Sequence, residues 1–176
     1  GQHVVISGDE HTLRFLERLG TKHLLAIQEN PPLHFHHPAR GFCEFTLPAL
    51  PSPLHLLSGI VTTDLFSFSD KLRMMRAGFH LHMTHDLRAM TICQWLDSIG
   101  QTEETKRSFW EPLAISIMNE HIGKASAKVF VESLRHAFLR GRKNSALVLP
   151  RVGLNELYVD AAASFLAECG GKVQCN

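Results

Sequence analysis

The sequence predicts an α+β protein in which helices predominate, with a small antiparallel β-meander packed against a helical bundle. Between Thr21 and Pro53, short runs alternate apolar with polar residues and are separated by proline and glycine, which is typical of strands joined by turns. After Pro53, apolar residues recur at helical spacing behind serine and threonine caps. We expect one compact domain in three consecutive parts: a β-rich part over residues 1–53, a helical part over 54–145, and a strand–helix–strand part over 146–176.

A strand and a helix are expected first. The segment His3–Ile6 is apolar and β-branched, which favours a strand. Asp9 is placed to cap a helix, because its carboxylate can accept from the free amides of the first turn. That helix carries a leucine face and is expected to end at Gly20, since glycine readily adopts the left-handed conformation found after helices.

Three strands are expected to form the meander, and proline-containing turns separate them: Leu24–Ile27, Leu33–His36 and Gly41–Thr46. Prolines then end it at positions 48, 51 and 53, because proline lacks the amide that a sheet requires.

The helical part is marked by capping signals. Ser67 stands three residues before Asp70, and Thr91 three residues before Gln94, so each pair has the pattern of a capping box. The helix after Ser67 carries one apolar stripe: Leu72, Met75, Phe79 and Met83. Helices are expected at 54–61, after Ser67, after Thr91, after Thr102, from Pro112, at 125–140 and at 154–169. Two further strands are expected at 146–150 and 172–175.

Charge and motifs argue against several classes of protein. The net charge is +1, from 18 basic and 17 acidic residues, so the chain lacks the basic excess typical of nucleic-acid binding. Neither a signal peptide nor a run of apolar residues long enough to cross a membrane is visible. The sequence contains no glycine-rich phosphate loop and no nucleophile elbow. The four cysteines form no CxxC pair, and we expect free thiols.

Two groups among the twelve histidines have a spacing that invites a metal hypothesis: His34-x-His36-His37 and His80-x-His82-x-x-His85. Zinc requires three or four converging ligands with supporting partners, and neither group is part of an HExxH or CxxC motif. We therefore interpret both groups as surface histidines and predict no metal site.

The remaining signal is apolar, with eleven phenylalanines and two tryptophans. Most of these side chains are expected in the core. Others could line a long apolar cavity, or form a membrane-facing patch around 53–57, and the sequence leaves these alternatives open.

Several segments together resemble one family. The most specific are Gln94-Trp95-Leu96, Phe109-Trp110-Glu111-Pro112-Leu113 and Ala125-Ser126-Ala127 with Val129-Phe130. With the proline-rich segment 47–57 and both terminal segments, they resemble an internal part of the squalene-associated FAD-dependent desaturases. These are relatives of hydroxysqualene dehydroxylases and phytoene desaturases among the amine-oxidase-type flavoproteins.

The resemblance implies the substrate-side part of a larger enzyme, inserted between the two halves of an FAD-binding domain. FAD would then be held by the rest of that protein and not by this chain, which would be inactive alone. The implied reaction is a flavin redox step on a squalene- or carotenoid-type isoprenoid, and desaturation, dehydroxylation and isomerisation stay open. By position in the family, Gln2, His3 and Trp110 are candidate substrate-binding residues; no catalytic residue is assigned.

The same resemblance implies a cytoplasmic protein, with peripheral membrane contact of the larger enzyme left open. Its partners would be the FAD-binding domain and an apolar isoprenoid, with no nucleic acid. The alternative from the residues themselves is a stand-alone helical module that binds a lipid or a protein without catalysis. The insertion hypothesis predicts that Gly1 and Asn176 lie on the same face of the protein, near enough to rejoin one sheet.

Overall fold

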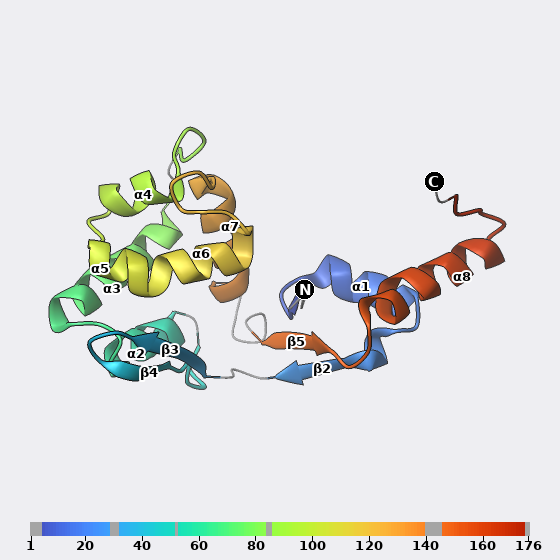
Figure 1. Ribbon diagram of the computed structural model, residues 1–176, viewed down its shortest axis with the longest axis horizontal. Coiled ribbons are helices and arrows are strands. Elements are labelled where there is room, and N and C mark those ends of the chain that lie inside the picture. The colour runs from blue at the N-terminus through green and yellow to red at the C-terminus, as the bar shows by residue number, and fades with distance from the viewer. Residues whose placement is uncertain (1–4, 29–31, 52, 84–85, 140–145, 175–176) are drawn as a thin grey trace. The chain divides into compact units, whose positions relative to one another are not determined.

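The computed structural model describes residues 5–28, 32–51, 53–83, 86–139 and 146–174 (Figure 1). Helices predominate and the strands pair antiparallel, which confirms the α+β prediction. The contacts group the chain differently from three consecutive parts. Residues 1–29 and 143–176 make one unit, called here the split unit, and residues 30–142 make a second, the central unit.

The split unit contains a three-stranded antiparallel sheet with the order β1-β5-β2. Its elements are β1 (Val5–Ile6), α1 (Glu10–Arg18), a 3₁₀ turn (Lys22–Leu24), β2 (Leu25–Gln28), β5 (Leu147–Pro150), a π-helical turn (Asn155–Val159) and α8 (Asp160–Glu168). A small core joins them: Leu16, Leu25, Val148 and Leu157.

The signals around α1 act as predicted. The Asp9 carboxylate accepts a hydrogen bond from the Thr12 amide, and Gly20 has φ of +76° just after the helix. This satisfies a free amide at the start of the helix and lets the chain turn at its end.

The predicted three-stranded meander is wrong in one respect, because β2 does not pair with its neighbour in sequence. It pairs with β5, from Leu25 opposite Pro150 to Gln28 opposite Leu147, seen as the adjoining blue and orange arrows in Figure 1. The pairing buries Leu25 against Val148 in the core of the split unit. A partner more than a hundred residues away leaves no local signal in the sequence.

The strand predicted at 172–175 is also not formed. Lys172 to Gln174 are exposed and extended without a strand partner in the described residues, and Cys175 lies outside them. The segment has one apolar side chain, Val173, which is 58% exposed, so a strand there would have no apolar face to bury.

The central unit packs a hairpin against helices. The hairpin consists of β3 (Leu33–His37) and β4 (Gly41–Phe45), paired from Leu33 opposite Phe45 to His37 opposite Gly41. The helices are α2 (Leu54–Thr62), α3 (Phe68–His82), α4 (Ile92–Ser98), α5 (Glu103–Thr105), α6 (Glu111–Met118) and α7 (Ala127–Phe138). One large apolar core joins the hairpin to all of them except α5.

The predicted helix caps are present. The hydroxyls of Ser67 and Thr102 accept from the amides three residues on, at the starts of α3 and α5. At Thr91 both bonds of the capping box form, because the Gln94 side chain also accepts from the Thr91 amide. These local rules place the helix starts correctly.

The segment around Pro112 differs from a simple helix start. The helix is continuous from Glu103 to Met118, with a π-helical turn over Lys106–Trp110 in its middle. At the end of that turn the Glu111 amide bonds to the Lys106 carbonyl, five residues back. Proline cannot donate, and its ring would clash with the carbonyl four residues earlier in a regular helix. The wider turn accommodates it.

Helix α2 approaches the end of β4 closely at Gly59. A Cβ at this position would lie 2.8 Å from the Thr46 carbonyl oxygen and 3.2 Å from the Phe45 ring. The distance of 2.8 Å is shorter than real Cβ contacts. The nearest atom belongs to the backbone, so it cannot shift without moving the end of the strand. Glycine is therefore required for α2 to pack on the end of β4.

We expect Gly59→Ala to lower the free energy of unfolding by about 1–3 kcal/mol, because the added methyl group forces α2 from β4. Urea denaturation of the purified chain measures this. The matched control is Gly78→Ala in α3, where a Cβ meets nothing within 4 Å. Gly78→Ala should raise the free energy of unfolding by up to about 1 kcal/mol, because alanine has a higher helix propensity than glycine. Equal effects at both positions would contradict the close-packing argument.

Candidate apolar binding site

The central unit contains a cavity of about 250 Å³. Its walls come from the hairpin, α2, α3, the π-helical turn, α6 and α7. Among the described lining residues, His82 and Trp110 have polar atoms in their side chains. The lining residues are Leu33, Phe45, Pro53, Leu56, Leu57, Ile60, Met74, Met75, Gly78, Phe79, Leu81, His82, Phe109, Trp110, Leu113, Leu134, Phe138 and Leu139. An apolar cavity with no carboxylate favours an uncharged, hydrocarbon-like ligand.

Helix α3 supplies both the open space and the mouth of the cavity. Gly78 lies in the wall, and the absence of atoms within 4 Å of its would-be Cβ means that the missing side chain leaves free volume there. One residue further, Phe79 also lines the cavity but is 64% exposed. Phe79 therefore lies where the cavity meets the solvent.

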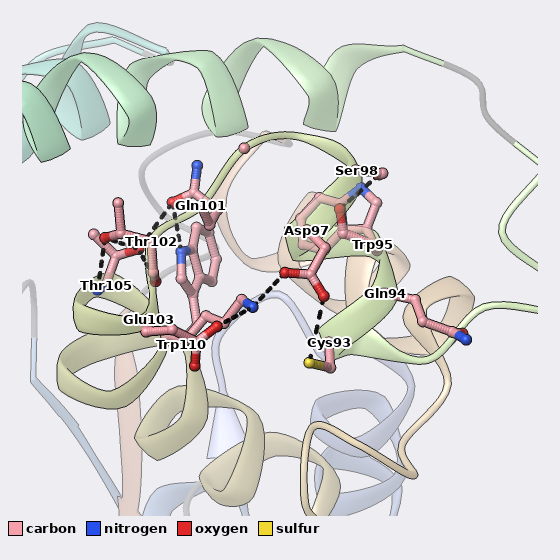
Figure 2. Close-up of polar contacts among 12 residues, drawn as sticks. Cys93, Gln94, Trp95, Asp97, Ser98, Gln101, Thr102, Glu103, Thr105 and Trp110 are labelled. Carbon is pink, nitrogen blue, oxygen red and sulfur yellow. Dashed lines mark hydrogen bonds and ion pairs between the residues drawn. The ribbon is translucent and has the colours of Figure 1, made fainter.

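Trp110, the predicted substrate-binding residue, lies in the wall and is 4% exposed. Its ring makes edge contacts with Trp95 at 6.0 Å and Phe130 at 6.3 Å between centroids. Its indole N–H donates to Gln101 Oε1 at 2.9 Å (Figure 2). Trp110 is thus both a packing residue of the core and part of the cavity wall.

Gln101 fixes the orientation of Trp110, and the sequence analysis did not single it out. Its side chain is buried, and its amide nitrogen donates to the Arg73 carbonyl at 2.9 Å. Both ends of the amide are therefore engaged, which holds the indole N–H away from the apolar space. Gln101 follows Gly100 and precedes the helix cap, and nothing in this local sequence indicated that its side chain would bond to Trp110.

A second polar group joins α4 to the π-helical turn. The Lys106 side chain is buried, and its ammonium donates to the carboxylates of Asp97 and Glu103, the latter at 2.7 Å. Burial by itself lowers the pKa of Lys106, but the hydrogen bonds to Asp97 and Glu103 outweigh it and raise the pKa to about 12. Lys106 is therefore a permanently charged structural contact and is not part of the cavity wall.

Cys93 lies beside this group, with its Sγ 3.8 Å from Asp97 Oδ2 (Figure 2). Burial raises the pKa of the Cys93 thiol, the Lys106 ammonium opposes the shift, and the Asp97 carboxylate adds to it. A thiol held protonated in this way is a poor nucleophile. The arrangement gives no support for cysteine catalysis.

The other sequence-predicted candidates lie elsewhere. Gln2 and His3 lie outside the described residues. His34 and His36 share an exposed face of β3, whereas His37 is buried and bonded to Glu104. No group of three or more metal-binding side chains occurs in the part of the chain that the structure describes, which excludes His85.

The patch proposed around 53–57 divides between exposed and enclosed positions. Leu54 is 51% exposed, His55 is buried, and Leu56 and Leu57 line the cavity. Among the described residues, no helix is long and apolar enough to cross a bilayer.

The start of α1 does not fit the phosphates of FAD. At this turn between β1 and α1, Asp9 already accepts from an amide of the first turn, with Glu10 beside it. Two carboxylates at a helix N-terminus repel phosphate and occupy its donors. FAD binding by a larger protein would have to use residues other than these.

No protein-family model matches the chain, and no curated protein matches its sequence.

The raised pKa of Lys106 predicts a pH dependence of stability. The pKa of Lys106 in the folded chain, about 12, exceeds its ordinary value of about 10.4. The contribution of the charged side chain to the free energy of unfolding is therefore complete below about pH 10.4 and is lost as the pH rises through about 12. Lys106→Met should therefore cost about 2 kcal/mol of unfolding free energy at neutral pH. The difference from wild type should shrink between about pH 10.4 and 12.

Urea denaturation of both proteins across this pH range measures the difference. The control is Lys22→Met, which removes an exposed ion pair to Glu17 at 3.3 Å and should cost less than about 0.5 kcal/mol at neutral pH. A wild-type–Lys106→Met difference that stays constant through about pH 12 would contradict the assignment.

Proposed function

We propose that the central unit binds a squalene- or carotenoid-type isoprenoid in its apolar cavity, as the substrate-binding part of a FAD-dependent oxidoreductase similar to phytoene desaturases. The observation that carries the proposal is the cavity of about 250 Å³, walled by aliphatic and aromatic side chains with Trp110 among them. An isoprenoid hydrocarbon has no group that requires a hydrogen bond, and this wall offers almost none.

The chemistry of the cavity supports binding without a catalytic group of its own. The ammonium of Lys106 and the carboxylates of Asp97 and Glu103 bond to one another, and none of the three residues lines the cavity. The chain would contribute apolar contact area, exclusion of water and orientation of the hydrocarbon. When bound in the larger protein, FAD would supply the redox chemistry.

The arrangement of the chain supports the insertion hypothesis. Strand β1 from the first part of the chain and β5 from the last part lie in one sheet, and the central unit is formed by the residues between β2 and β5. The pairing brings the first and last strands into one unit, which agrees with a chain joined at both ends to the same domain. The two ends themselves, Gly1 and Asn176, lie outside the described residues.

A second candidate function is a lipid- or protein-binding module without catalysis. The observation that favours it is the exposed apolar surface of α3, where Phe68 is 79% and Leu72 is 51% exposed. The two candidate functions differ in whether a flavin acts on what the chain binds.

We expect squalene, presented in cyclodextrin, to raise the melting temperature of the purified chain by several degrees. A ligand that binds only the folded state at a hundredfold excess over its Kd adds about 2.7 kcal/mol. Gly78→Leu should abolish the shift, because the new side chain occupies the cavity. The matched control is Gly153→Leu, at an exposed position of the split unit with open space around it.

Differential scanning fluorimetry of the three proteins gives the result. No shift in the wild type, or the same shift in Gly78→Leu, would reject binding in this cavity.

The flavin part of the proposal has its own test. We expect the purified chain to show no flavin absorbance, because the start of α1 carries Asp9 and Glu10 where a phosphate would have to bind. Absorbance spectroscopy after incubation with FAD and gel filtration measures this. Stoichiometric retention of FAD would overturn the assignment of FAD binding to other residues.

A further inference from the structure

The cavity is too small for a whole long isoprenoid. An apolar protein cavity of about 150 Å³ binds benzene, which corresponds to about 25 Å³ for each carbon atom. By that measure a cavity of about 250 Å³ holds about ten carbons, or two isoprene units. Squalene has six isoprene units, so most of such a ligand must lie outside.

The cavity opens beside an exposed apolar row on α3. Phe68, Leu72, Met75 and Phe79 follow one another at intervals of four, three and four residues, which places them on one face of the helix. We call these four residues the α3 stripe. Met75 and Phe79 line the cavity, whereas Phe68 and Leu72 do not. The stripe therefore runs from the wall of the cavity to the surface.

Packing of the central unit does not explain this stripe. The buried face of α3 is a different one, formed by Met74, Ala77 and Leu81. Along the stripe the exposed fractions are 79% for Phe68, 51% for Leu72 and 64% for Phe79. From Phe68 to Met75 the helix rises by about 10 Å, a length of surface that matches the next part of an extended chain.

We infer that the cavity holds one end of the isoprenoid, about two isoprene units long, and that the rest of the chain leaves past Phe79 and lies along the α3 stripe. The inference rests on the proposed function and adds how the ligand is oriented and how its length is recognised. The cavity selects for a slender hydrocarbon end group. The stripe contributes affinity only when the ligand is longer than the cavity.

A series of isoprenoid hydrocarbons tests the two parts separately. Myrcene has two isoprene units and squalene six, and quenching or shift of tryptophan fluorescence reports binding because Trp110 is in the wall. The double variant Phe68→Ser/Leu72→Ser should weaken squalene binding about tenfold and leave myrcene binding unchanged. Phe42→Ser is the matched control, since Phe42 is 88% exposed on β4 and lies outside the cavity wall.

A measurement independent of affinity uses the variant Leu72→Cys. Squalene should slow the alkylation of the thiol introduced at position 72, whereas myrcene should not. Peptide mass spectrometry measures the extent of alkylation. The result supports the inference if protection depends on ligand length.

The outcomes separate the inference from the proposed function. If myrcene and squalene both bind but the double variant affects both equally or neither, the stripe is not part of the site and the proposed function stands. If no isoprenoid binds the wild type, both fail. If myrcene fails to bind while squalene binds and protects position 72, the inference that the cavity encloses one end of the isoprenoid is wrong.

Discussion

The packing of two adjacent aromatic residues on one π-helical turn is the contact on which the central unit depends. Phe109 meets Phe35, Phe45 and Phe66, and so joins the hairpin to the start of α3. Trp110, next in sequence, meets α4 and α7 through Trp95 and Phe130. One turn of helix therefore connects the hairpin, the start of α3, α4 and α7. The same two rings form part of the cavity wall, so the site cannot be separated from the core.

The rigidity of these rings also accounts for why a cavity persists. Each ring is held from several sides, and the Trp110 indole is further fixed by its bond to Gln101. Rings fixed in this way cannot turn to fill the volume left by Gly78, whereas a flexible core would collapse into it. Met74 and Met75 on the opposite wall are adaptable side chains, which suits a site that accepts hydrocarbon chains of variable shape.

Local signals made the helices predictable, whereas contacts between residues far apart in the sequence could not be predicted. The caps at Asp9, Ser67 and Thr91 act through hydrogen bonds within three residues, so the sequence contains the whole interaction. The pairing of β2 with β5 depends on a partner far along the chain and was missed. At the site, Trp110 was predicted, but the sequence could not divide core from cavity, because apolar side chains serve both. On α3 the sequence predicted one apolar stripe, which includes Leu72 and Phe79, whereas the helix buries a different face.

The pairing of β2 with β5 bears on the order in which the chain folds during synthesis. Strand β2 leaves the ribosome more than a hundred residues before β5, so the sheet of the split unit cannot close until most of the chain has been made. The hairpin and the helices of the central unit need only contacts within themselves and can form meanwhile. Once folded, the central unit replaces a long flexible loop by a compact body, which lowers the entropy cost of bringing β2 and β5 together. The cavity would then be complete before the sheet of the split unit closes.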